Sequence, residues 1–228
     1  KQMAGNVTIS GLEQIQNSGT EAVINLLESR IGVLEKTMSN ILSTSLYSDG
    51  TGTNGKEVGG LQLLVADAGT GTVGGINSST FTFFQNVQTT ATSSAFSTTN
   101  IQADMNTIYL SLVRGSDSPD LIMADTNAYK SFLGSLQAIQ RVTSDRVATS
   151  GFTSVQYLNS DVIFDDACPA NKMYFLNTDY LRLEVAANRN FVPGEAKMSV
   201  NQDAMVTPMF WSGNLTCSNR ALQGVIHT

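Results

Sequence analysis

The stretch that decides the fold runs from Gly11 to Leu46 and reads GLEQIQNSGTEAVINLLESRIGVLEKTMSNILSTSL. Its apolar residues recur at three-, four- and eight-residue spacings, which is typical of one face of an α-helix. They are Leu12, Ile15, Val23, Leu27, Ile31, Leu34, Met38 and Ile41. Ser10 and Glu13 fit a capping box at the start. The pattern predicts one long helix of about 54 Å at ~1.5 Å per residue, with its apolar face packed on a sheet. Gly19 is its weak point, where the helix could kink, and Thr20 could restart it.

Two glycine-rich segments follow this helix, at residues 49–60 (DGTGTNGKEVGG) and 69–77 (GTGTVGGIN). Both contain GxGxxG, and the first also fits the GxxxxGK pattern of a phosphate-binding loop. Such a loop joins a strand to the N-terminus of a helix, whereas here a helix precedes the loop and a strand is predicted at 61–65. Glu57 stands where a hydroxyl should bind Mg²⁺, and its charge would repel phosphate. We therefore expect turns here, and no nucleotide or other cofactor.

The rest of the chain alternates helical and extended patterns, so the predicted class is α+β. We expect a polar linker at 88–104, a helix from Ile101 to Val113, and a buried strand at 120–124. A helix capped by Asp125 or Thr126 should follow and reach Ile139. The remaining predictions are a loop at 141–152, strands at 155–158, 162–164, 173–176 and 181–185, and a terminal hairpin of 205–211 and 215–226 that turns at 212–214.

Composition excludes several classes of function. Charged residues make up only 14% of the chain, and the net charge is −6. The 13 basic residues are scattered, whereas a nucleic-acid binder usually concentrates them on one face. No apolar run approaches the ~20 residues that a membrane-spanning helix needs. Weak charge suits a protein whose faces meet neighbours, because buried charges are costly.

No constellation of residues predicts catalysis or metal binding, and we expect no catalytic, cofactor or metal site. The single histidine is His227, next to the last residue, which is a poor position for a catalytic base. Asp165 and Asp166 are adjacent, so they should form a turn and not a metal site. Cys168 and Cys217 are expected to be reduced, buried thiols, the alternative being a disulfide.

The succession of motifs resembles the phage major head proteins of the Hong Kong 97-type fold. The resemblance covers about residues 9–226 and rests on order and spacing, since no single motif is specific. Its parts are the long helix leading to DGTG, Gly59-Gly60-Leu61, Gly74-Gly75-Ile76, Ser118-Pro119-Asp120-Leu121-Ile122-Met123, Met173-Tyr174-Phe175-Leu176-Asn177-Thr178 and Gly213-Asn214-Leu215-Thr216-Cys217-Ser218-Asn219-Arg220.

The resemblance implies a capsid fold with a long spine helix, a peripheral-domain sheet and a mixed α/β axial domain. Residues 1–114 would hold the spine helix, the glycine-rich loops and part of the peripheral domain. Residues 115–200 would be mostly axial, and 201–228 would return to the body as strands. The family's N-terminal arm and extended loop would precede Lys1, so no cross-linking residue is carried over. We expect this chain alone to form a monomer or small ring, and a longer parent to close shells.

The implied function is a structural, non-enzymatic subunit of an icosahedral phage head, enclosing double-stranded DNA with little specific contact. Its partners would be copies of itself in pentamers and hexamers, with scaffold and portal proteins and no membrane. It would reside in the virion after assembly in the bacterial cytoplasm. Two alternatives stay open: an encapsulin-like nanocompartment shell, and an unrecognised enzyme that uses the glycine-rich loops.

Overall fold

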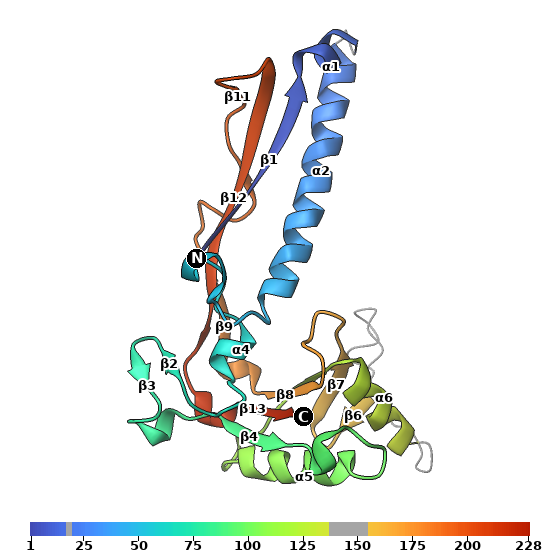
Figure 1. The fold of residues 1–228 in the computed structure, drawn as a ribbon, viewed down its shortest axis with the longest axis vertical. Helices are drawn as coiled ribbons and strands as arrows, with labels where there is room; N and C mark the ends of the chain where they lie inside the picture. The colour runs from blue at the N-terminus through green and yellow to red at the C-terminus, as the bar shows by residue number, and fades with distance from the viewer. Residues whose placement is uncertain (17–19, 137–154) are drawn as a thin grey trace.

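The computed structural model describes residues 1–16, 20–136 and 155–228, and the side chains of all of these except residues 20–25. It consists of an elongated arm and a more compact part (Figure 1). In the arm, strand β1 (Gln2–Ser10), helix α1 (Gly11–Gln16) and helix α2 (Thr20–Ser45) lie beside the 14-residue strand β12 (Ala204–Cys217).

The arm sheet is built on β12, which has antiparallel partners along its whole length. β1 pairs with residues 204–212 and β9 (Leu181–Val185) with residues 213–217. On the side away from β1, β10 (Val192–Pro193) and β11 (Lys197–Met198) add short pairings. Met38 of α2 packs against this sheet beside Trp211 and Met209, as the helical pattern predicts.

The stretch from Gly11 to Leu46 forms two helices and not one, and α2 begins at Thr20, where the sequence predicts that the helix could restart. The Glu13 carboxylate lies 2.6 Å from the Arg30 guanidinium. Residues 17 positions apart would be separated by about 25 Å along a straight helix, so α1 and α2 are not collinear. Residues 17–19 between them, and the side chain of Val23, lie outside the described part of the chain. The capping box is confirmed, since Ser10 and Glu13 exchange two hydrogen bonds of 3.1 and 3.3 Å.

The compact part contains a six-stranded sheet buried on both faces. Its order is β4 (Val87–Thr90), β13 (Gly224–His227), β8 (Lys172–Leu176), β5 (Leu121–Ala124), β7 (Ser160–Phe164) and β6 (Val155–Tyr157). Helices α5 (Ile101–Leu112) and α6 (Thr126–Ser135) cover one face. The short helix α4 (Leu61–Leu64) and Tyr47 cover the other. Successive residues of β8 therefore alternate between two cores, Met173 and Phe175 in one, Tyr174 and Leu176 in the other.

Three predictions about helices and strands, most of them in the compact part, are confirmed. Helix α5 begins at Ile101, as predicted, and it buries the apolar side chains of Ile101, Met105, Ile108, Tyr109 and Leu112. The predicted β-to-α unit is β5 followed by α6, and the Asp125 side chain caps the helix by accepting from the Ala128 amide at 2.8 Å. The strands expected near 155–158, 162–164, 173–176 and 181–185 are all present. Ile139 and the loop predicted at 141–152 lie outside the described residues.

Two predicted elements differ in the structure. Leu61–Leu64 is a helical turn and not a strand, because Leu61 and Leu64, three residues apart, both bury against the sheet. Gly60 precedes this turn at a point where a Cβ atom would stand 2.2 Å from the Leu46 carbonyl oxygen. The expected linker at 88–104 begins as strand β4, which pairs in parallel with the C-terminal strand β13. Thr92 then binds the Asp104 carboxylate through its hydroxyl and its amide, at 2.6 and 3.1 Å.

The predicted terminal hairpin is wrong. Ser212-Gly213-Asn214 continues β12 without turning, and β13 belongs to the other sheet. A side chain at Gly213 would meet the Glu184 carbonyl oxygen at 2.5 Å and the Trp211 ring at 2.9 Å. Glycine is therefore needed at this position because β9 lies very close, and not because the chain turns.

Several short elements complete the described fold. The second glycine-rich segment forms a two-stranded hairpin, β2 (Thr72–Val73) and β3 (Ile76–Asn77), that projects from the compact part (Figure 1). Gly74 and Gly75 make its turn with φ of 57° and 82°. The first segment contains the single turn α3 (Gly52–Gly55), and 3-10 turns lie at Thr82–Phe84, Thr92–Ser94, Thr178–Tyr180 and Arg220–Leu222.

Candidate functional site

The side chains singled out for possible chemistry are held in structural contacts. The imidazole of His227 is half-buried, and its Nε2 lies 3.2 Å from the amide oxygen of Gln88. Asp165 accepts a 2.6 Å hydrogen bond from the Tyr47 hydroxyl and a 2.9 Å bond from the Ala167 amide. Its carbonyl also accepts from the Cys168 amide at 3.1 Å, which confirms the predicted turn.

Both cysteines are free thiols, and Cys168 is buried as predicted, whereas Cys217 is half-buried. Burial is the main cause that raises the pKa of the Cys168 thiol to about 12, with the Asp125 and Asp165 carboxylates adding to it. Burial also raises the pKa of Cys217. Because the thiolate is the reactive form, neither side chain is suited to nucleophilic chemistry at neutral pH.

The first glycine-rich loop has no phosphate-loop geometry. Its helical turn α3 is interrupted by left-handed conformations at Thr53 and Asn54. The Glu57 carboxylate accepts a 3.0 Å hydrogen bond from the Thr53 hydroxyl, which directs a negative charge into the loop. A helical turn, not the predicted strand, follows at Leu61, but it is a single turn that starts after Gly60. The expectation that no nucleotide binds here stays a prediction.

Over the ranges 1–16, 20–136 and 155–228, no group of three or more His, Cys, Asp and Glu side chains is arranged to hold a metal ion. Within the same residues, no helix combines the length and the apolar character needed to cross a membrane.

The Arg220 guanidinium is fully buried and joins segments that are far apart in the sequence. It donates to the Leu64 carbonyl at 2.6 Å, the Asn86 side-chain oxygen at 3.0 Å and the Phe84 carbonyl at 3.4 Å. It also lies 5.4 Å from the centre of the Phe84 ring. Burial lowers the pKa of this group from its ordinary value. Arg220 therefore fixes the backbone at the end of α4 and at the turn Thr82–Phe84.

This turn presents an aromatic knob, which we define as Phe81–Phe84. Phe84 faces Arg220, whereas Phe81 and Phe83 are 49% and 73% exposed. The two exposed rings pack edge to face, with centres 6.0 Å apart. Backbone hydrogen bonds from Phe81 to Asn77 and from Phe84 to Phe81, each 3.0 Å, hold the knob in shape. Large aromatic side chains fixed on a rigid base and open to solvent are typical of interaction surfaces.

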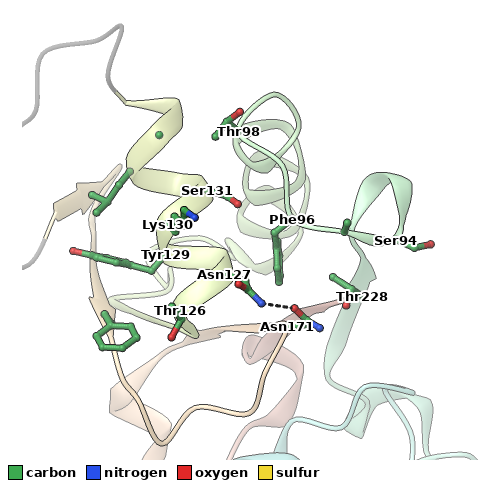
Figure 2. Close-up of a pocket in the computed structure, with 14 residues that line it drawn as sticks. Ser94, Phe96, Thr98, Thr126, Asn127, Tyr129, Lys130, Ser131, Asn171 and Thr228 are labelled. Atoms are coloured by element: carbon green, nitrogen blue, oxygen red, sulfur yellow. Dashed lines mark hydrogen bonds between the residues drawn. The ribbon is translucent and has the colours of Figure 1, made fainter.

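A hollow of about 860 Å³ lies along α6, and we call it the α6 groove (Figure 2). Residues 94–98 form one wall and α6 the other, with Asn171 and the terminal residue Thr228 between them. Phe96 lies in the middle of the close-up, and the Asn127 side chain donates to that of Asn171 at 3.0 Å. Tyr129 and Phe164 add a second aromatic surface, with ring centres 6.0 Å apart.

The sequence did not single out the knob or the groove. FTFF at 81–84 is visible as an aromatic cluster, but its exposure depends on the Arg220 contact from the far end of the chain. The walls of the groove come from segments that only the six-stranded sheet brings together. Exposed apolar residues also occur on the arm, where Leu12 and Ile15 of the predicted helical stripe are 64% and 73% exposed.

The chain is similar to known proteins in its structure, and not detectably in its sequence. No known family profile matches the sequence, and no curated protein matches it either. The capsid of cyanophage A-1(L) is similar, with a TM-score of 0.75 and 17% identity, over 98% of this chain and 75% of the other. The SrpI encapsulin of Synechococcus elongatus is also similar, with a TM-score of 0.66 and 11% identity, over 100% of this chain and 73% of the other.

The capsid of Myoviridae phage XM1 is similar as well, with a TM-score of 0.61 and 9% identity, over 100% of this chain and 72% of the other. All three likenesses take in the arm and the compact part together, because they span nearly the whole chain. The chain therefore has the Hong Kong 97-type capsid fold of tailed-phage major capsid proteins.

Proposed function

We propose that the chain is a structural subunit of an icosahedral tailed-phage head. Copies would form pentamers and hexamers, and these would close into a shell around double-stranded DNA. The observation that carries the proposal is the match to the cyanophage A-1(L) capsid over 98% of this chain. Since a fold alone does not determine function, the surfaces of the molecule matter as a second line of support.

Those surfaces fit a protein that meets copies of itself. Only 14% of the residues are charged, and large apolar side chains are exposed on both the arm and the compact part. Among them are Phe83 at 73%, Leu110 at 70%, Met198 at 72% and Val200 at 98%. Exposed apolar side chains at several separate places favour contacts with several neighbours, which is what a subunit inside a shell requires.

We further propose that the arm and the compact part occupy different positions in the shell. The arm, with α2, β1 and β12, would be the peripheral part, and α2 would be its spine helix. The six-stranded sheet with α5 and α6 would be the axial part around the five- and six-fold axes. This assigns most of residues 115–180 to the axial part, together with β4, α5 and β13.

The proposal includes no catalytic step and no cofactor. It places the protein in the virion after assembly in the bacterial cytoplasm, with scaffold and portal proteins as further partners. The net charge of −6 supports enclosure of DNA without tight binding, because phosphate contacts need clustered Lys and Arg.

An encapsulin-like nanocompartment is the second candidate. The observation that favours it is the likeness to the Synechococcus elongatus encapsulin over 100% of this chain. Both candidates share the shell and differ in its contents, so the contents decide between them.

The test is to collect particles from a lysate of the bacterium that carries the gene, and to digest them with nuclease before opening them. A phage head should release nuclease-protected double-stranded DNA. A co-purifying protein cargo in fixed proportion, with no DNA, would favour the nanocompartment. A lysate in which the protein sediments only as a small species, with no particles, would contradict both.

A further inference from the structure

Two features of the compact part are complementary in chemistry and lie on different sides of the molecule. The aromatic knob follows the β2–β3 hairpin at the left of the compact part in Figure 1, whereas α6, which lines the groove, lies at its right. Phe81 and Phe83 are exposed on the knob. The groove has its own aromatic residues, Phe96, Tyr129 and Phe164.

We propose that the aromatic knob of one copy seats in the α6 groove of the next copy around a ring. This inference rests on the proposed function and deepens it, because it names the two surfaces that meet inside a pentamer or hexamer. A knob and a socket on different sides of one molecule make a heterologous contact, and repeated heterologous contacts close into a ring when the rotation between neighbours allows it. The partner that fits is therefore a second copy of this chain.

The absence of charged residues from the knob also supports a second copy of this chain as the partner. Residues 68–103 include the whole knob and the 94–98 wall of the groove, and they contain no Asp, Glu, Lys, Arg or His. Among the described residues that line the groove, Lys130 is the one with a charged side chain. The knob can enter without burying a charge of its own, and the cores of protein interfaces are depleted of charge in this way.

The knob also has the character of an anchor. Its two exposed rings are large, and the buried Arg220 contacts to the Phe84 and Leu64 carbonyls already hold its base. A preformed anchor loses little conformational freedom on binding. Because Phe side chains bury roughly 150–250 Å² each, and a stable interface needs about 800 Å² per partner, the knob would be the centre of a wider contact.

Cysteine cross-linking tests the contact directly. One preparation of the protein carries Phe83→Cys and another carries Thr98→Cys, at an exposed position on the groove wall. The two are mixed under assembly conditions and treated with a short thiol cross-linker. The expected result is a two-chain product in the mixture whose linked peptides contain positions 83 and 98. Each preparation alone should give no such product, and the unsubstituted protein controls for Cys168 and Cys217.

Three results would overturn the inference. Cross-linking of the Phe83→Cys preparation to itself would indicate a knob-to-knob contact. Assembled particles without the 83–98 link would contradict the contact and leave the proposed shell function standing. A protein expressed from its complete reading frame that stays monomeric at every concentration would contradict both.

Substitutions give a second, independent measurement. Phe83→Ser should raise the protein concentration needed for ring formation at least about tenfold, as expected for an anchor residue at an interface centre. Phe83→Leu should raise that concentration much less. Leu158→Ser is the matched control, because Leu158 is 62% exposed between β6 and β7 and lines neither surface. Equal effects of Phe83→Ser and Leu158→Ser would show that the loss is not specific to the knob.

Discussion

At the scale of single residues, Arg220 does the most to connect distant parts of the chain. It brings the end of α4, the aromatic knob and Asn86 to one point through hydrogen bonds to Leu64, Phe84 and Asn86. The sequence gives no sign of this role, since Asn219-Arg220 resembles an ordinary polar turn. The reason is physical: the partners lie more than 130 residues away, and burial of a guanidinium depends on the tertiary fold.

Replacing Arg220 should therefore destabilise the protein strongly. Arg220→Met keeps much of the side-chain volume but leaves the Leu64 carbonyl and the Asn86 oxygen without this donor inside the protein. We expect a loss of ~2–4 kcal/mol in the free energy of unfolding, measured by urea denaturation. Arg182→Met, at an exposed position, is the control and should change stability by less than ~0.5 kcal/mol. Equal midpoints for the two variants would contradict the buried contact.

Glu13 allows a test of how α1 lies against α2, because its carboxylate contacts Arg30. Hydrogen bonds from the Arg30 guanidinium, and then from the Ser10 amide, lower the pKa of the Glu13 carboxyl from 4.5 to about 2. A lowered pKa in the folded state means that the carboxylate stabilises the fold above the ordinary pKa near 4.5. That contribution is lost as the pH falls toward about 2.

The measurement is an NMR titration of the Glu13 carboxyl in the parent and in Arg30→Gln. We expect a pKa near 2 in the parent and a value shifted back toward 4.5 in the variant, because the main cause of the lowering is removed. A titration near 4.5 in the parent would indicate that α1 does not fold back onto α2.

At the scale of elements, the sequence pattern correctly predicted those helices and strands that are determined by contacts within a few residues. Helix α5 and the β5–α6 unit were correct because their apolar spacing and the Asp125 cap act within a few residues. Strand β4 was missed because its polar Thr and Gln side chains give no local signal and its partner is the C-terminal strand. The terminal hairpin was wrong because Gly213 suits both a turn and a close approach, and only the position of β9 decides between them.

The packing of α2 on the arm sheet can be measured with a matched pair of substitutions. Met38 is 2% exposed beside Trp211, and Ile41, one turn along the same helix, is 49% exposed. Met38→Ala should leave a cavity and cost ~2–4 kcal/mol, whereas Ile41→Ala should cost less than ~1 kcal/mol. Thermal and urea unfolding of both variants provide the comparison. If Met38→Ala is the milder change, α2 does not pack in this way.

At the scale of the whole molecule, the sequence predicted the fold from the order of many weak motifs. The knob and the groove could not be predicted in the same way, because each is assembled from segments far apart in the chain. Shell closure depends on many modest contacts made together, so a weakly charged subunit with separate apolar surfaces is suited to it. This is consistent with a fold matched over nearly the whole chain at identities of 17% and below.

The central claim is that the protein builds a shell, and negative-stain electron microscopy of the protein expressed from its complete reading frame tests it most directly. The account predicts closed, hollow particles of uniform diameter, with five- and six-fold clusters of subunits on their surface. A preparation that contains only monomers or open, irregular aggregates over a wide range of protein and salt concentrations would contradict it.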